Sequence, residues 1–269
     1  MHVFKEGVKM SALSIHINQL AYNAQNENSS TKASERIIAD IALDIKPNEC
    51  VCIVGPSGCG KTTLLNAVAG IINTQNDDVN DHVSGNIMLQ FATPSPTIGY
   101  IFQEPRLMPW LTLYENIALV MPKDDPVKIT AILDAVGLAA QANSYPNHLS
   151  GGMQRRASIA RAFVIEPLIL LLDEPFVSLD APTAMQCREL LISLAKLHKT
   201  TIIFVTHDLN EALYLGDRVV FLSPSPARII HELALNNVYE AYDSAAQTNL
   251  KSELFKRFPK ILEGQLSQD

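Results

Sequence analysis

Cysteine is scarce in this chain, and the cysteines present do not have the spacing of a metal or redox motif. The sequence has four, Cys50, Cys52, Cys59 and Cys187, and none of them forms a C-x-x-C pair. Cys50 and Cys52 lie two positions apart on a predicted strand, so both point to one face, which suits core packing better than a disulfide. We therefore expect a reduced, cytosolic compartment.

Long apolar runs and clusters of basic residues are also lacking. No apolar stretch approaches the roughly 20 residues that a membrane-spanning helix needs. No sustained apolar segment follows the basic residues near the N-terminus, so no signal peptide is apparent. The net charge is −7, from 21 basic and 28 acidic residues, without a basic stripe. We expect no nucleic-acid partner, and any function at a membrane would depend on other chains.

The strongest motif present is G-x-x-x-x-G-K-[ST] at residues 55–62, between an apolar run and a helix-forming segment. Its glycines allow backbone N–H groups to turn inward around a polyphosphate, and the following helix adds its positive N-terminal dipole. The Lys61 ammonium can reach the β- and γ-phosphates, the Thr62 hydroxyl can ligate Mg²⁺, and Thr63 suits the α-phosphate. An ordinary glycine-rich turn is the competing interpretation. We expect the nucleotide to contact Gly55, Ser57, Gly58, Cys59, Gly60, Lys61, Thr62 and Thr63.

Two carboxylates, Asp173 and Glu174, directly follow the apolar run 168–172. Ligands gather at the carboxyl ends of parallel strands, where Asp173 could hold Mg²⁺ and Glu174 could polarise an attacking water. Simple capping of the next segment is the alternative, and the upstream phosphate loop disfavours it. His207 follows the apolar run 201–205 by two positions. A lone histidine at a strand end is usually structural, but this one belongs to the sheet that presents the carboxylates, which favours contact with a γ-phosphate.

A second anion site is indicated where Ser150, Gly151 and Gly152 begin a predicted helix. Taken alone, Ser-Gly-Gly is more often a plain loop. The helix that follows contains three arginines, for which a solvated or structural face is favoured over phosphate binding: Arg155, Arg156 and Arg161.

Periodicity along the chain predicts an α/β fold. The 269 residues, 47% apolar, suit one domain with a subdomain. Apolar and polar residues alternate in a predicted edge strand at 12–22 and a second strand at 37–45, and polar loops are predicted at 23–34 and 73–82. A fully apolar run predicts a parallel strand buried on both faces at 168–172, and apolar runs predict further buried core strands at 51–54 and 201–205. We expect a P-loop NTPase core with a mainly parallel sheet, an N-terminal antiparallel β subdomain and a helical insertion subdomain at about 104–165.

Together these motifs resemble those of ATP-binding-cassette (ABC) transporter ATPase subunits, over about residues 13–230. The resemblance lies in the phosphate loop, Gln103 after a strand, LSGGM at 149–153, LLLDEP at 170–175, SLD at 178–180 and His207. It implies an ABC ATPase domain at 1–230, with the helical subdomain inside it, and a C-terminal extension at 231–269 for which no role is predicted. Met153 replaces the more usual glutamine of LSGGQ, a change to a contact made mainly by backbone.

The resemblance also implies roles for single residues with the cofactors ATP and Mg²⁺. Tyr22 would stack on adenine, and Gln103 would sense Mg²⁺ and the attacking water. Glu174 would be the general base and His207 the γ-phosphate sensor. The two-subunit contacts would come from Ser150, Gly151 and Gly152, which bind the γ-phosphate held by the other subunit, and from Asp180, which bridges the subunits.

Two segments, FQEPRLMPWLTLYENIAL and THDLNEALYLGDRVVFLSPSPARI, are similar to the nitrate/sulfonate/taurine class of importers. That similarity implies a homodimer of ATPase subunits, a transmembrane permease and, indirectly, a periplasmic solute-binding protein. It places the chain peripherally at the cytoplasmic face of the inner (plasma) membrane. A soluble cassette protein acting on nucleic acid or ribosomes is the alternative, but the long coiled coil or second cassette typical of such proteins is missing. A regulatory P-loop switch would lack LSGGM.

Two side chains leave alternatives open. Cys59 lies beside Lys61 and a helix N-terminus, both of which lower a thiol pKa, so either a reactive thiol or an inert packed one is expected. Trp110, the single tryptophan, is either a core residue or part of an exposed groove that receives a permease helix.

Overall fold

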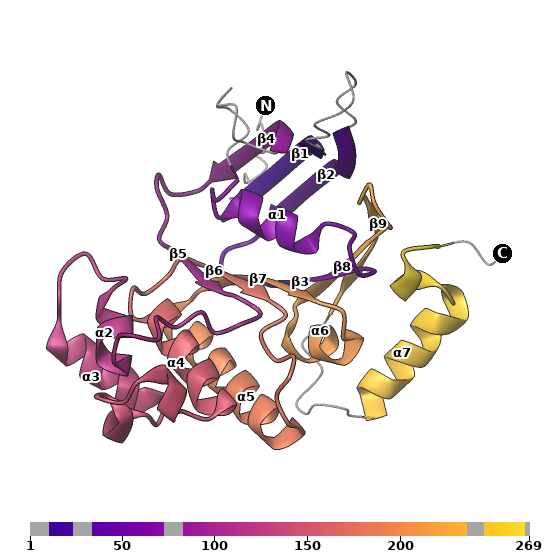
Figure 1. Cartoon of the computed structure of the whole chain (residues 1–269). Helices are drawn as coiled ribbons and strands as arrows, with labels where there is room; N and C mark the ends of the chain where they lie inside the picture. Colours follow the sequence, from indigo (N-terminus) through magenta and orange to yellow (C-terminus); the bar gives the residue numbers. More distant parts are fainter. Residues whose placement is uncertain (1–10, 24–33, 73–82, 236–244, 267–269) are drawn as a thin grey trace, which may run out of the picture.

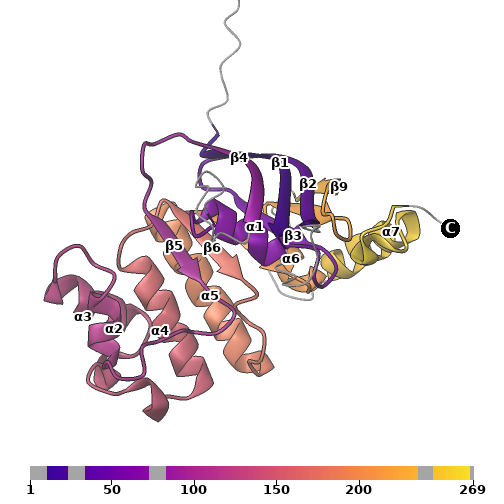
Figure 2. The same cartoon turned by 45° about the horizontal axis from the view of Figure 1, so that its top comes forward.

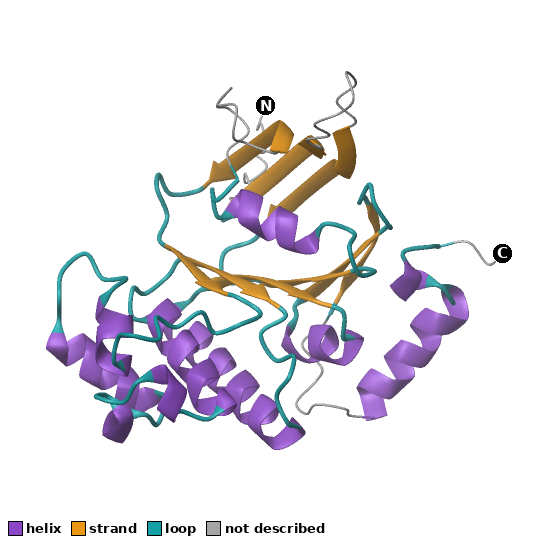
Figure 3. Ribbon diagram, in the orientation of Figure 1, coloured by secondary structure: helices purple, strands orange, loops and turns teal. Residues whose placement is uncertain are grey.

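The computed structural model describes residues 11–23, 34–72, 83–235 and 245–266, and in this part of the chain two sheets lie in separate layers. Helix α1 (Lys61–Val68) lies between them, and the other helices lie on the far side of the larger sheet (Figure 1, Figure 3). One hydrophobic core fills the space around α1, and a second lies between the larger sheet and the helices. The sheet therefore separates two independently packed cores.

The smaller sheet is antiparallel and consists of β1 (Leu13–Asn23), β2 (Ser34–Ile45) and β4 (Val83–Phe91). The strand order is β2-β1-β4, so β1 is the central strand and the prediction of an edge strand is wrong. Alternation of apolar and polar residues indicates a strand with one buried face, and central and edge strands both have one. Whether β1 is central depends on its second partner strand, β4, which comes from a distant segment of the chain. The loops predicted at 23–34 and 73–82 lie almost wholly outside the described residues.

The larger sheet is parallel except at one edge. Its order is β5 (Ile98–Ile101), β6 (Ile169–Asp173), β7 (Thr201–Thr206), β3 (Cys50–Val54), β8 (Arg218–Leu222) and β9 (Ile229–Ala234). Strand β9 pairs antiparallel with β8 and was not anticipated from the sequence. On β3, Cys50 and Cys52 pack into the core beneath the helices, while Val51 and Ile53 pack into the core around α1. The predicted α/β architecture is confirmed, and β3, β6 and β7 end at one edge.

Helices α2 (Leu113–Ala118), α3 (Pro126–Ala135) and α4 (Gly151–Phe163) lie together on one side of the molecule, away from α7, in both views (Figure 1, Figure 2). Local capping explains where each begins. Thr112 forms a capping box with Glu115, Asp125 accepts from the first turn of α3, and the Ser150 hydroxyl accepts from the backbone N–H of Met153. These helices lie within the insertion predicted at about 104–165. That this segment is a subdomain separate from the core stays a prediction.

Helices α5 (Ala181–His198) and α6 (Leu209–Leu215) cover the sheet beside α4, and Asp180 and Asp208 cap their N-termini. The C-terminal helix α7 (Ala245–Arg257) packs near α6, where Lys251 Nζ donates to Asn210 Oδ1 at 2.6 Å. Ile261, in a short 3₁₀ turn (Ile261–Glu263), is fully buried in the same core. In the described part of the chain, no helix is long and apolar enough to span a membrane.

Candidate functional site

The phosphate loop connects the end of β3 to the start of α1, as the sequence predicts. Gly58 has φ +76° and Gly60 has φ +105°, in the left-handed region that favours glycine. A Cβ on Gly60 would lie 2.6 Å from the Ile37 side chain, so both conformation and space require glycine there. Ser57 and Gly58 are exposed at the tip of the loop. The loop therefore presents backbone to solvent at a helix N-terminus.

Lys61 lies across the inside of this loop. Its side chain is buried, and its Nζ donates to the backbone oxygens of Gly55 at 2.9 Å and Pro56 at 3.0 Å. These bonds hold a cation at the centre of the loop, where a polyphosphate would place its negative charge. Thr63 is also buried, whereas Thr62 is exposed towards the end of β6.

Cys59 is 1% exposed and packs into the core around α1. Burial raises the pKa of its thiol, and the nearby Lys61 charge and backbone hydrogen bonds oppose that rise without cancelling it. The expectation of a lowered thiol pKa is therefore wrong, and the inert packed thiol is the supported alternative. The sequence shows the helix N-terminus and the lysine but not the depth at which the sulfur lies.

Asp173 ends β6 directly beside the phosphate loop. The Thr62 hydroxyl donates to Asp173 Oδ1 at 3.1 Å, which joins a hydroxyl and a carboxylate that are 111 positions apart in the chain. Burial raises the Asp173 pKa, and the Thr62 hydrogen bond lowers it; the Glu174 charge adds to the rise. A cation near this carboxylate would offset its buried charge. The described residues offer no cluster of three or more His, Cys, Asp or Glu side chains. The Thr62 hydroxyl and the Asp173 carboxylate fit Mg²⁺, which takes one or two protein oxygens and completes its shell with phosphates and water.

Glu174 and His207 lie at the carboxyl ends of neighbouring strands and touch. His207 Nδ1 lies 3.0 Å from Glu174 Oε2, and the imidazole is more exposed than the carboxylate, at 60% against 18%. Glu174 has φ +43°, and its backbone N–H donates to the Val205 carbonyl of β7 at 2.9 Å. Strand pairing therefore sets the carboxylate beside the imidazole, with the exposed histidine towards the solvent side.

Gln103 follows β5 in a loop that α4 holds by its arginines. The buried Arg155 donates from Nη1 to the Phe102 carbonyl at 2.7 Å and from Nη2 to the Gln103 carbonyl. Arg161 donates to the carbonyls of Pro105 and Arg106. The Gln103 residue is exposed. Desolvation lowers the Arg155 pKa to about 10. The predicted structural role of Arg155 and Arg161 is correct, but nothing in the sequence pattern indicates that they bind the Gln103 loop.

Ser150, Gly151 and Gly152 begin α4 with Ser150 and Gly151 exposed. A Cβ on Gly152 would lie 2.5 Å from the Thr183 side chain of α5, and Thr183 donates from Oγ1 to Asp180 Oδ2 at 2.8 Å. The Ser-Gly-Gly turn and Asp180 are thus neighbours on one surface. The described contacts join Gly152 to α5 and join Thr62 to Asp173 at the phosphate loop. None of these contacts links the Ser-Gly-Gly turn to the phosphate loop of the same chain. The side chain of Tyr22 lies outside the described residues, so its stacking role stays a prediction.

A buried ion pair that the sequence does not reveal is linked to Thr206, the residue before His207. Arg188 of α5 donates from Nη2 to Glu211 Oε1 of α6 at 2.6 Å, and Glu211 Oε2 accepts from the Thr206 hydroxyl at 2.9 Å. The sequence pattern indicates this ion pair only weakly, because a charged residue on a helix usually lies on the solvated face. Only the three-dimensional arrangement shows that this face is covered.

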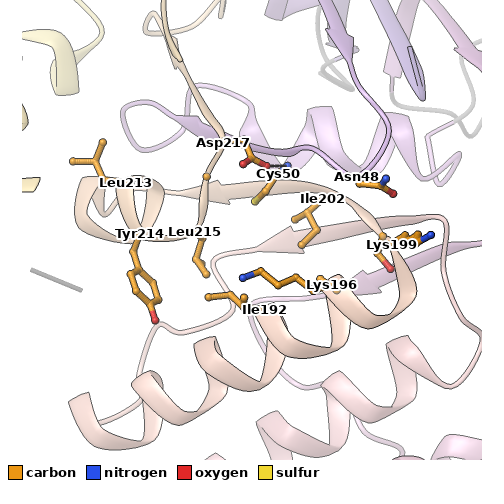
Figure 4. Close-up of a pocket in the computed structure, with 13 residues that line it drawn as sticks. Asn48, Cys50, Ile192, Lys196, Lys199, Ile202, Leu213, Tyr214, Leu215 and Asp217 are labelled. Atoms are coloured by element: carbon orange, nitrogen blue, oxygen red, sulfur yellow. Dashed lines mark hydrogen bonds between the residues drawn. The ribbon is translucent and has the colours of Figure 1, made fainter. Parts of the chain in front are cut away.

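A cavity of about 800 Å³ lies at the opposite, amino ends of β3 and β7, between the sheet and helices α5 and α6. Figure 4 shows Lys196 reaching across it and Lys199 pointing away. Cys50 at its edge donates its backbone N–H to Asp217 Oδ2 at 2.8 Å. This cavity contains none of the predicted site residues, so we assign the phosphate chemistry to the loop and strand ends.

Comparison with known proteins matches residues 38–177 to a family model described as ABC transporter. The aliphatic sulfonates import ATP-binding protein SsuB 2 of Burkholderia lata is 49% identical over 201 residues, which cover 73% of this chain and 71% of that protein. The SsuB protein of Bacillus anthracis is 39% identical over 228 residues, covering 83% and 88%. A solved dimeric ATP-binding cassette in a post-hydrolysis state with ADP and Pi superposes with a TM-score of 0.63 at 26% identity, covering 83% of this chain and 99% of that one.

Proposed function

This chain belongs to the ABC transporter family, and we propose that it is the ATP-hydrolysing subunit of an importer for aliphatic sulfonates or similar small anionic solutes. ATP and Mg²⁺ are its cofactors, as for the family. The sulfonate substrate is proposed because curated relatives at 49% and 39% identity are named for aliphatic sulfonate import. The observation that carries the hydrolytic role is the contact of Glu174 with His207 beside the phosphate loop.

In this site the chain itself binds and orients ATP. Lys61 and the loop N–H groups hold the phosphates, and Thr62 and Asp173 would hold Mg²⁺, which neutralises charge on the phosphate oxygens. Glu174 would take a proton from the attacking water, and His207, whose Nδ1 lies 3.0 Å from Glu174 Oε2, would orient that carboxylate and contact the γ-phosphate. Gln103, whose backbone carbonyl accepts a hydrogen bond from Arg155, would sense Mg²⁺ and the attacking water.

Uptake measurements test the substrate. Cells that lack this gene should lose uptake of a labelled short alkanesulfonate, and the wild-type gene should restore it. Taurine and nitrate uptake, measured in the same strains, distinguish the members of the importer class. A strain without the gene that takes up all three solutes at the wild-type rate would contradict the proposed substrate class.

The permease contact is proposed at residues 107–111. Trp110 is 70% exposed, so the alternative of a core tryptophan is wrong. The segment is held by the fully buried Asn116, whose Nδ2 donates to the carbonyls of Met108, Leu111 and Thr112 and whose Oδ1 accepts from the Met108 N–H. An aromatic side chain on a fixed backbone is typical of the anchors that protein interfaces use. The chain would then lie peripherally at the cytoplasmic face of the inner membrane.

We expect Met108→Arg and Trp110→Ala to break assembly with the permease while ATP binding by the purified subunit stays normal. Leu107 packs against the helical core, so its substitution would mix unfolding with loss of contact. Leu197→Arg is the matched control, because Leu197 is 73% exposed on α5. Copurification with the permease from detergent-solubilised membranes measures the effect. Full recovery of the permease with both variants would place the contact elsewhere.

A further inference from the structure

The ion pair between Arg188 and Glu211 lies in the protein interior behind the proposed catalytic residues. Its two side chains are 8% and 7% exposed, and their nearest atoms are 2.6 Å apart. Arg188 belongs to α5, which Asp180 caps, and Glu211 belongs to the first turn of α6. The pair therefore joins the helices that follow the Glu174 and His207 strand ends.

On the histidine side, the pair is bonded to the residue before His207. Glu211 Oε2 accepts from the Thr206 hydroxyl at 2.9 Å, and the hydroxyl oxygen accepts from the backbone N–H of Asp208 at 3.0 Å. Thr206 is 1% exposed. The residues on both sides of His207 are thus fixed by one hydroxyl, and that hydroxyl is fixed by Glu211.

On the glutamate side, the pair faces the residue two positions after Glu174. The Arg188 guanidinium carbon lies 5.1 Å from the centre of the Phe176 ring, within the range of a cation–π contact. The Phe176 ring meets the Phe204 ring of β7 edge-on at 6.1 Å. The left-handed turn at Glu174 is therefore held between its backbone bond to β7 and a ring that the buried cation covers.

We propose that Arg188 and Glu211 are positioning residues that hold Glu174 and His207 at the separation that ATP hydrolysis requires. This proposal rests on the proposed function, since it takes Glu174 as the base. A buried ion pair is a poor source of stability, because desolvation of both charges offsets their attraction, and apolar replacements are often neutral. Its directional bonds instead fix geometry, and displacement by about 1 Å can cost roughly 100-fold in rate.

The deciding variant replaces both charges with apolar side chains, Arg188→Met with Glu211→Leu. We expect its melting temperature and its KM for ATP to stay near those of the wild type, while kcat at saturating Mg²⁺ and ATP falls about 10- to 100-fold. A matched pair at Thr206 tests the same link: Thr206→Val removes the hydroxyl and should lower kcat about 10-fold, whereas Thr206→Ser keeps the hydroxyl and should restore most of it.

A control ion pair lies at the amino ends of β3 and β8, at the opposite edge of the same sheet. Arg218 Nε donates to Glu49 Oε1 at 2.9 Å, and Arg218→Met with Glu49→Leu should leave kcat unchanged, because this pair lies far from the Glu174 and His207 strand ends. A wild-type kcat in the Arg188 and Glu211 variant would overturn the proposal. Should that variant fail to fold, equal kcat values in Thr206→Val and Thr206→Ser would overturn it instead. Hydrolysis by Glu174→Gln at the wild-type rate would contradict the proposed function separately.

Discussion

Glu174→Gln should bind ATP with nearly normal affinity and hydrolyse it at least about 100-fold more slowly than the wild type. The amide keeps the shape of the side chain but cannot take a proton from water. The phosphate loop, which provides the binding energy, lies on β3 and α1 and is unchanged. Single-turnover hydrolysis and equilibrium nucleotide binding, measured on the same preparation, separate the two effects.

Asp173→Asn serves as the contrasting variant. It removes charge next to Thr62, so we expect weaker binding that depends on Mg²⁺, with Mg²⁺-free nucleotide affected much less. If Glu174→Gln and wild type hydrolyse ATP equally, Glu174 has no part in the mechanism. If both variants lose Mg²⁺-free binding, the substitutions have disturbed the loop and not the chemistry.

Ser150→Arg should abolish ATPase activity while leaving nucleotide binding intact. Ser150 lies on an exposed surface next to Asp180 and makes its hydrogen bond to the first turn of α4, so its own phosphate loop does not need it. In a two-fold dimer each Ser-Gly-Gly turn can meet the loop of the other chain, and two ATP molecules are buried between them. Activity per molecule should then rise with protein concentration.

Mixing Ser150→Arg with Lys61→Ala provides the sharper experiment. A mixed dimer has one site with both defects and one with neither, so part of the activity should return, provided that one intact site can act alone. Asp125→Arg is the matched control, since it removes the N-cap of another exposed helix at a similar cost of about 1 kcal/mol. Light scattering measures the mass of Glu174→Gln in Mg²⁺-free ATP. If only monomer is present at high protein concentration, this dimer is ruled out for the isolated subunit.

Local signals account for the parts of the fold and site that the sequence predicts. The phosphate loop, the carboxylates at the end of β6 and the helix that begins after Ser150 each depend on residues within a few positions. The spacing of these residues in the sequence is therefore enough to predict their local structure. The predicted site residues that the structure describes take up positions consistent with their roles, but those roles stay predictions until variants are measured.

What the sequence missed depends on partners far apart in the chain. Strand β1 is central because β4, which lies at 83–91, returns to pair with it. The hold of Arg155 on the Gln103 loop spans 52 positions. Burial is likewise non-local, which is why the Cys59 pKa moves opposite to what its neighbours in sequence suggest.

The buried Asn116 has a consequence for the kinetics of assembly. Its amide already fixes the backbone of 108–112 in the free subunit, so a partner that binds there meets a surface whose shape precedes the encounter. Little conformational entropy remains to be lost on docking. Association should then be limited by diffusion and orientation, at about 10⁵ to 10⁷ M⁻¹s⁻¹, and not by a slow folding step.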